Sequence, residues 1–200
     1  RVIMMSFSKV TAREYNPAEE YSDIEYPESD GEPMGETGFH VIATLGLLGT
    51  LKQYFITETD VYVAADMFFY YEEGNPKKCK APDVMVIRGV GNHERRVFKL
   101  WEENAGPCVI FEVTSKSTKN EDMVDKKRLY ASLNVREYFL FDPLGDYLKK
   151  PLKGFRLQGG SYISLLPDRE GRIFSEELDA WLKPEGYFLR VVDSRTGKPV

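Results

Sequence analysis

Residues 108–114, with the sequence Cys-Val-Ile-Phe-Glu-Val-Thr, form the most strongly apolar predicted strand of this 200-residue chain. A short run rich in β-branched and aromatic residues predicts a strand, and continuous apolarity is typical of a strand that is covered on both faces. The run contains one acid, Glu112. Because an unpaired carboxylate is costly to bury, Glu112 is expected at a strand end, in an ion pair or on a metal ion.

Two more strands and a helix are predicted around this central strand. Asp83–Arg88 is a short apolar run that begins directly after Pro82. Arg136–Asp142 is a second run, which ends at Pro143. Between the central strand and Arg136, the segment Glu121–Leu133 has helical spacing of its apolar residues, and Asn134 is placed as a left-handed residue at its end. The central strand is therefore expected to lie inside a sheet.

A first helix is predicted over Glu36–Phe55, with Thr37 as its N-cap. Its expected core-facing stripe, at steps of three and four residues, is Val41, Leu45, Leu48, Leu51 and Phe55. Gly46 and Gly49 lower helix propensity, so close packing against another element is expected there.

The remaining segments predict a β-rich second half. Asp60–Tyr71 is predicted as one strand, and residues 89–106 as an irregular loop. Residues 146–166 are predicted as short hairpin strands with Gly154, Gly159 and Gly160 at the turns, followed by a last β unit around Tyr187–Asp193. We therefore predict an α/β (α+β) fold: one domain over residues 36–200 with a β-rich C-terminal part, preceded by an acidic arm, residues 1–35, that packs on it.

The composition excludes several classes of protein. Hydrophobic residues make up 42% of the chain and charged residues 30%, which is typical of a folded globular domain. No apolar run approaches the roughly 20 residues of a membrane helix, and no secretion signal is visible. The two cysteines, Cys79 and Cys108, fit neither a metal motif nor a disulfide framework, so reduced thiols and a cytoplasmic location are expected.

Charge is spread unevenly along the chain. Residues 1–36 contain nine acids and three bases, a balance of −6, whereas the whole chain has 32 acids and 27 bases, a balance of −5. Residues 75–128 contain twelve bases and eight acids, a balance of +4. A polyanionic partner is therefore compatible with the middle of the chain, although no strong basic stripe demands one and a mixed solvated surface is the simpler interpretation.

The candidate chemistry depends on carboxylates and lysines, because the chain has only two histidines, His40 and His93. Two carboxylates at neighbouring strand ends, Asp83 and Glu112, suit an ion such as Mg²⁺ that prefers oxygen ligands. A magnesium-bound water can attack a phosphodiester, and a nearby lysine stabilises the charge that develops. Such a site needs no histidine.

Structural interpretations compete with this one. Asp83 follows a proline, and an aspartate in that position is commonly a turn residue. Lys126 has the spacing for an i,i+4 surface pair with Asp122. Glu36 is favoured at a helix entrance by the helix dipole.

The motifs together resemble those of the Uma-two family, within the restriction-endonuclease-like PD-(D/E)xK nuclease superfamily. The motifs are Pro82-Asp83-Val84, residues 112–118 (Glu-Val-Thr-Ser-Lys-Ser-Thr), Asp122 through Lys126 to Tyr130, and residues 136–143 (Arg-Glu-Tyr-Phe-Leu-Phe-Asp-Pro). The resemblance covers roughly residues 20 to 193. It implies a restriction-endonuclease-like core, a central mixed sheet flanked by helices, with the acidic site at one edge of the sheet.

The resemblance also implies roles for individual residues. Asp83 and Glu112 match the motif carboxylates, and Glu36 is similar to the acid that such folds carry on their first helix. The superfamily's lysine, two residues after the glutamate, is Thr114 here. In the Uma-two pattern, a lysine four residues before the helix tyrosine takes the place of that lysine. This residue is Lys126 here, and Lys116 is the competing candidate. Tyr130 and Tyr138 also match family positions, but core packing explains them equally well.

The predicted function is therefore a Mg²⁺-dependent endonuclease that cleaves nucleic acid, with DNA as the expected substrate and Mn²⁺ as a substitute ion. Asp83 and Glu112 hold the metal, together with the carbonyl of Val113, while Lys126 activates water and Glu36 assists. A homodimer is compatible with duplex cleavage, and residues 147–163 are a candidate edge for it. The alternative is a protein that keeps the fold without catalysis, as a nucleic-acid-binding or partner-binding module.

Overall fold

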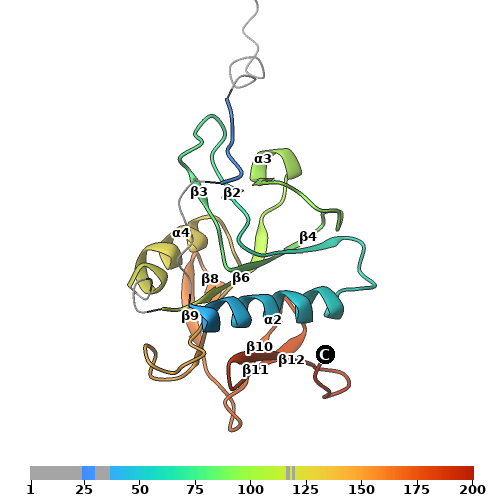
Figure 1. The fold of residues 1–200 in the computed structure, drawn as a ribbon, viewed down its shortest axis with the longest axis vertical. Helices are drawn as coiled ribbons and strands as arrows, with labels where there is room; N and C mark the ends of the chain where they lie inside the picture. Colours follow the sequence, from blue (N-terminus) through green and yellow to red (C-terminus); the bar gives the residue numbers. More distant parts are fainter. Residues whose placement is uncertain (1–23, 30–36, 116–117, 119) are drawn as a thin grey trace, which may run out of the picture.

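The computed structural model describes residues 24–29, 37–115, 118 and 120–200, and its centre is a six-stranded sheet (Figure 1). The strands lie in the order β1, β4, β6, β7, β8, β9. Their bounds are Val61–Ala64 (β1), Val84–Arg88 (β4), Pro107–Val113 (β6), Glu137–Phe141 (β7), Leu152–Gln158 (β8) and Ser161–Leu165 (β9). The β6–β7 pair is parallel and the other pairs are antiparallel, so the sheet is mixed.

Helices cover both faces of this sheet. Helix α2 (Gly38–Tyr54) lies on one face, together with a small sheet of β10 (Ile173–Ser175), β11 (Ala180–Glu185) and β12 (Phe188–Asp193). The other face carries a π-helical turn, η1 (Glu121–Lys126), that continues into α4 (Lys127–Ser132). A third sheet of β3 (Cys79–Lys80), β2 (Phe69–Tyr70) and β5 (Phe98–Lys99) lies beside the short helix α3 (Leu100–Glu103) (Figure 1).

The side chains of β6 alternate between two cores. Val109, Phe111 and Val113 belong to the cluster under α2, whereas Ile110 belongs to the cluster under α4. Every residue of β6 is buried, and the strand lies in the interior of the sheet. The predicted central strand and the predicted mixed sheet flanked by helices, with a β-rich C-terminal part, are thus confirmed.

The orientation predicted for the first helix is only partly right. Thr37 is the N-cap as predicted, since its side chain accepts the N–H of His40. The buried positions, however, are His40, Ala43, Thr44, Leu47 and Leu51. Of the predicted stripe, Leu51 and Phe55 are buried and Leu48 packs against the core, but Val41 is 43% exposed and Leu45 is 60% exposed. The helix is apolar on all sides, so its spacing does not identify a single core-facing stripe.

Three local predictions need correction. The predicted strand Asp60–Tyr71 is divided into β1 and β2 around Asp66, which has a left-handed backbone (φ 48°). The predicted loop 89–106 contains β5 and α3. Gly154 lies inside β8, where a Cβ atom would approach the Phe139 ring to 2.8 Å; Gly159 and Gly160 do form the predicted turn.

Most of the predicted acidic arm, residues 1–35, lies outside the described residues. Within 24–29, the Pro27 carbonyl accepts the Tyr70 hydroxyl at 2.5 Å, and the Tyr26 hydroxyl accepts the Gly74 N–H at 2.7 Å. These residues therefore contact the β2–β3 region. No disulfide joins Cys79 and Cys108. Across the described part of the chain, no helix combines the length and apolarity needed to span a bilayer.

Candidate active site

The two predicted carboxylates come from neighbouring strands. Asp83 directly precedes β4, and Glu112 is the penultimate residue of β6. The β4–β6 register pairs Val84 with Phe111, so the pairing brings Asp83 and Glu112 to neighbouring positions at one edge of the sheet. Asp83 is 9% exposed and Glu112 is 1% exposed. Both therefore require partners that offset their desolvation.

Asp83 is held by the backbone and by a histidine. One oxygen, Oδ2, accepts the backbone N–H of Val113 at 2.5 Å and lies 3.2 Å from Nε2 of His40. His40 lies in the first turn of α2, on its buried face, so the start of α2 packs directly against the site. These contacts fix the direction in which Asp83 points.

Glu112 is bound by a lysine and a tyrosine from the helical segment above it. Lys126 Nζ lies 3.0 Å from Glu112 Oε2, and the hydroxyl of Tyr130 donates to Oε1 at 2.8 Å. Because Lys126 and Tyr130 are four residues apart, they share one side of the helical segment. Each carboxylate oxygen of Glu112 therefore has its own donor.

The π-helical turn η1 brings in a third carboxylate. Asp122 is 1% exposed, and its Oδ1 lies 3.0 Å from Lys126 Nζ. The backbone carbonyl of Asp122 accepts the hydroxyl of Tyr138 at 3.0 Å, which ties the turn to β7. Lys126 thus bridges Glu112 and Asp122. The sequence suggested a surface pair between Asp122 and Lys126; the pair exists, but it is buried.

The site places three carboxyl groups, those of Asp83, Glu112 and Asp122, around one lysine. Burial raises the pKa of Glu112, Asp83 and Asp122 raise it further, and Lys126 offsets part of this. Burial also raises the pKa of Asp122. Burial alone would lower the pKa of Lys126, but the adjacent carboxylates outweigh it and hold the lysine charged. Carboxylates that raise one another's pKa in this way favour the binding of an additional cation.

The structure brings together Asp83, Glu112 and Lys126, the three residues on which the prediction chiefly depended. Val113 adjoins them, and its backbone N–H binds Asp83. Glu36 and Lys116 lie outside the described residues. Thr114, at the usual lysine position of the superfamily motif, is 3% exposed, and its hydroxyl makes no hydrogen bond within the described residues.

Sequence reasoning missed two residues of the site, His40 and Asp122. Each carried a signal: His40 is three residues after the N-cap Thr37, at the helix entrance, and Asp122 is four residues before Lys126. Tyr130, which core packing also explained, makes a specific hydrogen bond to Glu112.

The donor set suits a hard divalent cation. Asp83, Glu112 and Asp122 supply only oxygen ligands, and Mg²⁺ commonly binds through one or two carboxylates and keeps several waters. Among the described residues, no group of three or more His, Cys, Asp or Glu side chains is arranged to hold an ion. Asp83 and Glu112 are the two strand carboxylates that could offer oxygen ligands to such an ion.

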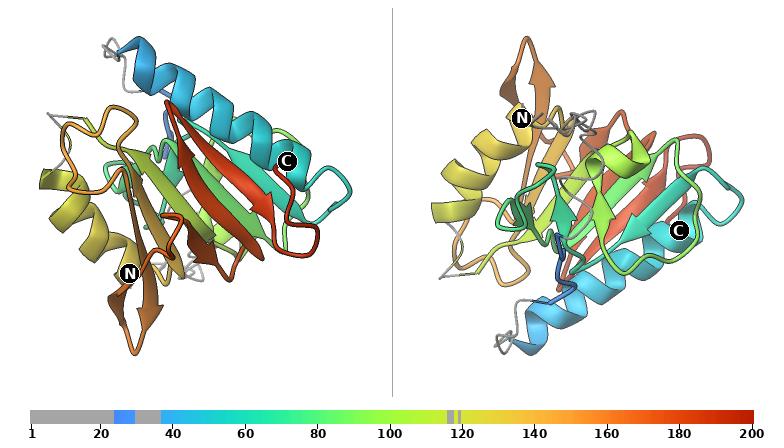
Figure 2. Two further views of the ribbon diagram at one scale, coloured as in Figure 1. Left: turned by 90° about the horizontal axis from the view of Figure 1, so that it is seen from below. Right: turned by 90° about the horizontal axis from the view of Figure 1, so that it is seen from above.

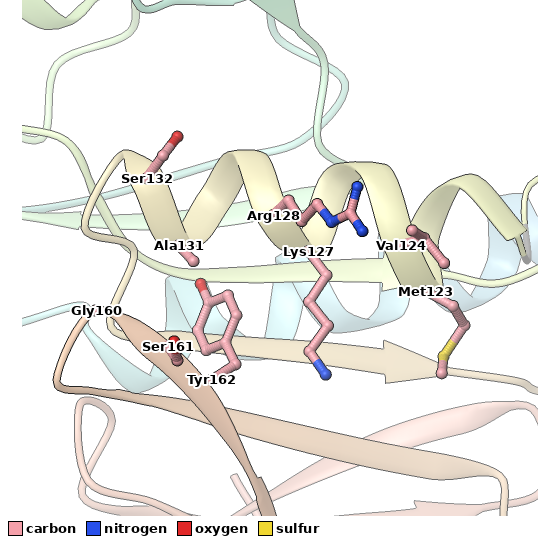
Figure 3. Close-up of a pocket in the computed structure, with 9 residues that line it drawn as sticks. All are labelled: Met123, Val124, Lys127, Arg128, Ala131, Ser132, Gly160, Ser161 and Tyr162. Atoms are coloured by element: carbon pink, nitrogen blue, oxygen red, sulfur yellow. The ribbon is translucent and has the colours of Figure 1, made fainter.

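A groove runs along the same helical segment. It has a volume of about 420 Å³ and is lined by Met123, Val124, Lys127, Arg128, Ala131, Ser132, Gly160, Ser161 and Tyr162. Figure 3 shows Lys127 extending from the helix toward the strands, while Arg128 lies along the helix. No acid lines this groove, which gives it a positive character.

Comparisons with known proteins identify the fold and the family of the chain. The solved structure of a protein described as a putative nuclease belonging to DUF820, from Anabaena variabilis, is similar to this chain with a TM-score of 0.54 and 11% sequence identity. The similarity covers 80% of this chain and 89% of that one, and it shows that the two share a fold. No curated protein matches. A family model described as "Uma2: Putative restriction endonuclease" matches residues 12–183, and the chain therefore belongs to the Uma2 family.

Proposed function

We propose that the protein is a metal-dependent endonuclease that hydrolyses phosphodiester bonds, with DNA as its substrate. The observation that carries the proposal is the contact of 3.0 Å between Lys126 Nζ and Glu112 Oε2, beside Asp83. It joins a lysine from the helix to Glu112, one of the two strand carboxylates of the nuclease motif, and the other, Asp83, is bound to the backbone N–H of the next residue, Val113. The family membership supports a nuclease, and the residues support the particular chemistry.

Each residue then has a distinct role. Asp83 and Glu112 would hold Mg²⁺, or Mn²⁺ in its place, with the Val113 carbonyl beside them. The ion would supply Lewis acidity and a water of lowered pKa. Lys126 positions that water and stabilises the negative charge that develops on the phosphoryl group. His40 orients Asp83, and Tyr130 orients Glu112. The proposed assistance by Glu36 comes from the resemblance alone.

The charge near the site favours a polyanionic substrate. Lys127 and Arg128 follow Lys126 directly and line a groove without acids. Within the described residues, neither forms an ion pair with a carboxylate. Lysines and arginines of this kind bind phosphates through an electrostatic term that weakens as salt rises. A dimer would allow two cuts in a duplex, and a cytoplasmic location is the accompanying expectation.

The test is a cleavage assay with plasmid, single-stranded DNA and RNA, in Mg²⁺, Mn²⁺ and EDTA. The proposal predicts metal-dependent cleavage of DNA by the wild type, and its loss in Asp83→Ala, Glu112→Ala and Lys126→Ala. Glu185→Ala removes an exposed carboxylate outside the site and serves as the control. Cleavage that persists in the three site variants would refute the site, whereas cleavage of RNA alone would correct the substrate.

A second function has its own supporting observation. Lys126 also pairs with the buried carboxylate of Asp122, which is expected where the lysine has a structural role in a binding module without catalysis. Calorimetry distinguishes the two. An active site predicts that Mn²⁺ binds the wild type and not Glu112→Ala. A wild type that binds nucleic acid without binding Mn²⁺ would favour the module.

A further inference from the structure

Helix α2 exposes an apolar face that none of the described residues covers. Apart from the buried His40, Lys52 is its only acidic or basic residue. Both views of Figure 2 place the helix at the periphery of the molecule. The large apolar side chains exposed on the helix and just after it are Phe39 (40%), Val41 (43%), Ile42 (47%), Leu45 (60%) and Ile56 (67%). A helix that is apolar on all sides is expected to be covered on all sides.

The β11–β12 turn extends this face. Tyr187 is 45% exposed and Phe188 is 36% exposed. The Tyr187 ring lies 4.8 Å from the Phe39 ring, and the Phe188 ring lies against Gly46. At roughly 150–250 Å² for a large side chain, the exposed parts of these seven residues amount to roughly 600 Å². That is at the upper limit of patches on monomers, and it is most of the roughly 800 Å² per partner of a stable interface.

The spacing of the outermost residues specifies a helix as the partner. The positions Gly38, Ile42, Leu45, Gly49, Lys52 and Ile56 are all exposed and follow one another at alternating steps of four and three. This period of 3.5 residues is the pattern of a seam between two packed helices. A Cβ atom added at Gly38 or Gly49 would meet nothing within 4 Å, so both glycines leave room for a partner's side chain.

The seam of one α2 helix is complementary to the seam of a second copy that runs in the opposite direction. When two copies of α2 are placed antiparallel, Leu45 of one faces Gly49 of the other, and Gly38 faces Ile56. Ile42 then faces the aliphatic stem of Lys52, whose Nζ is held 2.6 Å from Glu94. Each large residue therefore meets a small or flexible one, as interdigitating packing requires. A parallel pair would instead oppose Leu45 to Leu45 and Lys52 to Lys52.

We propose that the outer face of α2, completed by Tyr187 and Phe188, is the two-fold interface of a homodimer in which two α2 helices pack antiparallel. This inference is independent of the proposed catalytic function, because it rests only on the exposed face. It has a consequence for the candidate sites, since His40 lies seven residues from the centre of the pair. At 1.5 Å per residue, the two His40–Asp83 contacts would be separated by roughly 20 Å along the helix axis.

The mass of the full chain in solution tests the proposal, by light scattering over a wide range of protein concentration. The wild type is expected to have twice the chain mass of 23.0 kDa, and Leu45→Glu is expected to have the chain mass with an unchanged circular dichroism spectrum. Leu166→Glu is the matched control, because Leu166 is 87% exposed but follows the edge strand β9. It should remain dimeric.

A second measurement tests the antiparallel arrangement and does not depend on breaking the dimer. In the antiparallel pair, two copies of residue 45 lie roughly 6 Å apart along the axis, whereas two copies of residue 56 lie roughly 27 Å apart. A short bifunctional maleimide should therefore cross-link Leu45→Cys to itself, and Ile56→Cys should react no more than the wild type. Equal cross-linking of both variants would indicate a parallel pair.

Several results would overturn the proposal. A wild type that is monomeric at every concentration contradicts it. A dimer that Leu166→Glu dissociates and Leu45→Glu does not would assign the interface to the β9 edge. A monomer that dimerises only after removal of residues 1–23 would assign the α2 face to that segment. Leu45→Glu binding to lipid vesicles less than the wild type, without any dimer, would assign it to a membrane surface.

Discussion

Two buried glutamates on adjacent parallel strands, Glu112 on β6 and Glu137 on β7, have opposite surroundings. Glu137 is fully buried at the start of β7, where the Arg156 Nε–H donates to Oε1 at 2.9 Å. The Ser175 hydroxyl and the backbone N–H of Glu176 also donate to its carboxylate. Glu112 has one lysine and one hydroxyl, and it has Asp83 and Asp122 as charged neighbours.

Under the proposed function, this difference separates a structural carboxylate, Glu137, from a metal-binding one, Glu112. The groups that contact the Glu137 carboxylate donate hydrogen bonds to it, and Arg156 also balances its charge. These contacts tie β7 to β8 and β10. The surroundings of Glu112 contain further acids, which make its ionised form unfavourable and the arrival of a cation favourable. Both residues are buried, so burial does not distinguish them. The distinction lies in their neighbours, which are hydrogen-bond donors around Glu137 and include two further acids around Glu112.

The largest expected effect distinguishes Lys126, the basic partner of Glu112, from Arg156, the basic partner of Glu137. Lys126→Met should reduce DNA cleavage by at least roughly 1,000-fold, because it removes the group that stabilises the developing charge. Arg156→Met removes the partner of Glu137 and should leave cleavage per folded molecule unchanged. Single-turnover rates, corrected for the folded fraction, measure both. Equal losses in the two variants would contradict the distinction.

The free energy of unfolding should instead depend more on Glu137 than on Glu112. Glu137→Ala removes the acceptor of the Arg156 Nε–H, of the Ser175 hydroxyl and of two backbone N–H groups. Breaking a buried pair of this kind lowers the free energy of unfolding by about 3–5 kcal/mol. Glu112→Gln should cost less, because Lys126 keeps Asp122 as a partner and the crowding of acids falls. Urea denaturation measures both. A greater loss in Glu112→Gln would show that Glu112 is mainly structural.

Of the two glutamates, only Glu112 should contribute to stabilisation of the protein by a divalent metal. Because an ion that binds the folded state alone stabilises it by about 2.7 kcal/mol at a hundredfold excess over its dissociation constant, Mn²⁺ should raise the melting temperature by roughly 5–10 °C. Glu137→Gln should keep this rise, and Glu112→Gln should lose it. A rise that survives in Glu112→Gln would place the ion elsewhere.

The smallest expected effect concerns the two hydroxyls that donate to these glutamates. Tyr130→Phe and Ser175→Ala each remove one hydrogen bond to a buried carboxylate, and each should lower the free energy of unfolding by about 1.5 kcal/mol. Only Tyr130→Phe should also weaken Mn²⁺ binding, by about tenfold, because Tyr130 orients a proposed metal ligand. Manganese titrations followed by calorimetry would detect this, and an equal effect of Ser175→Ala would remove the distinction.

The strands of the sheet were predictable because burial imposes a simple pattern on them. β4, β6 and β7 are continuous apolar runs between turn residues, and each lies within two residues of its predicted bounds. The loop 89–106 gave no such signal, since β5 and α3 are short and depend on contacts with distant segments. Gly154 was predicted in a turn, although its function is to make room for Phe139 across the strand pair.

The first helix shows where pattern reasoning fails. Its apolar residues surround it, so the sequence could not tell the face that packs on the sheet from the face that remains exposed. The same ambiguity hid His40, whose importance depends on which side of α2 is buried. Asp122 was hidden for a related reason: spacing predicts its pair with Lys126 but cannot reveal that the pair is buried.

The central claim is that Glu112, unlike Glu137, is part of a metal-dependent hydrolytic site. The most direct test is the single-turnover rate of DNA cleavage in excess Mg²⁺ for Glu112→Gln and Glu137→Gln, each corrected for its folded fraction. The proposed site predicts that Glu112→Gln loses cleavage while Glu137→Gln keeps the wild-type rate. Wild-type cleavage by folded Glu112→Gln would contradict the claim.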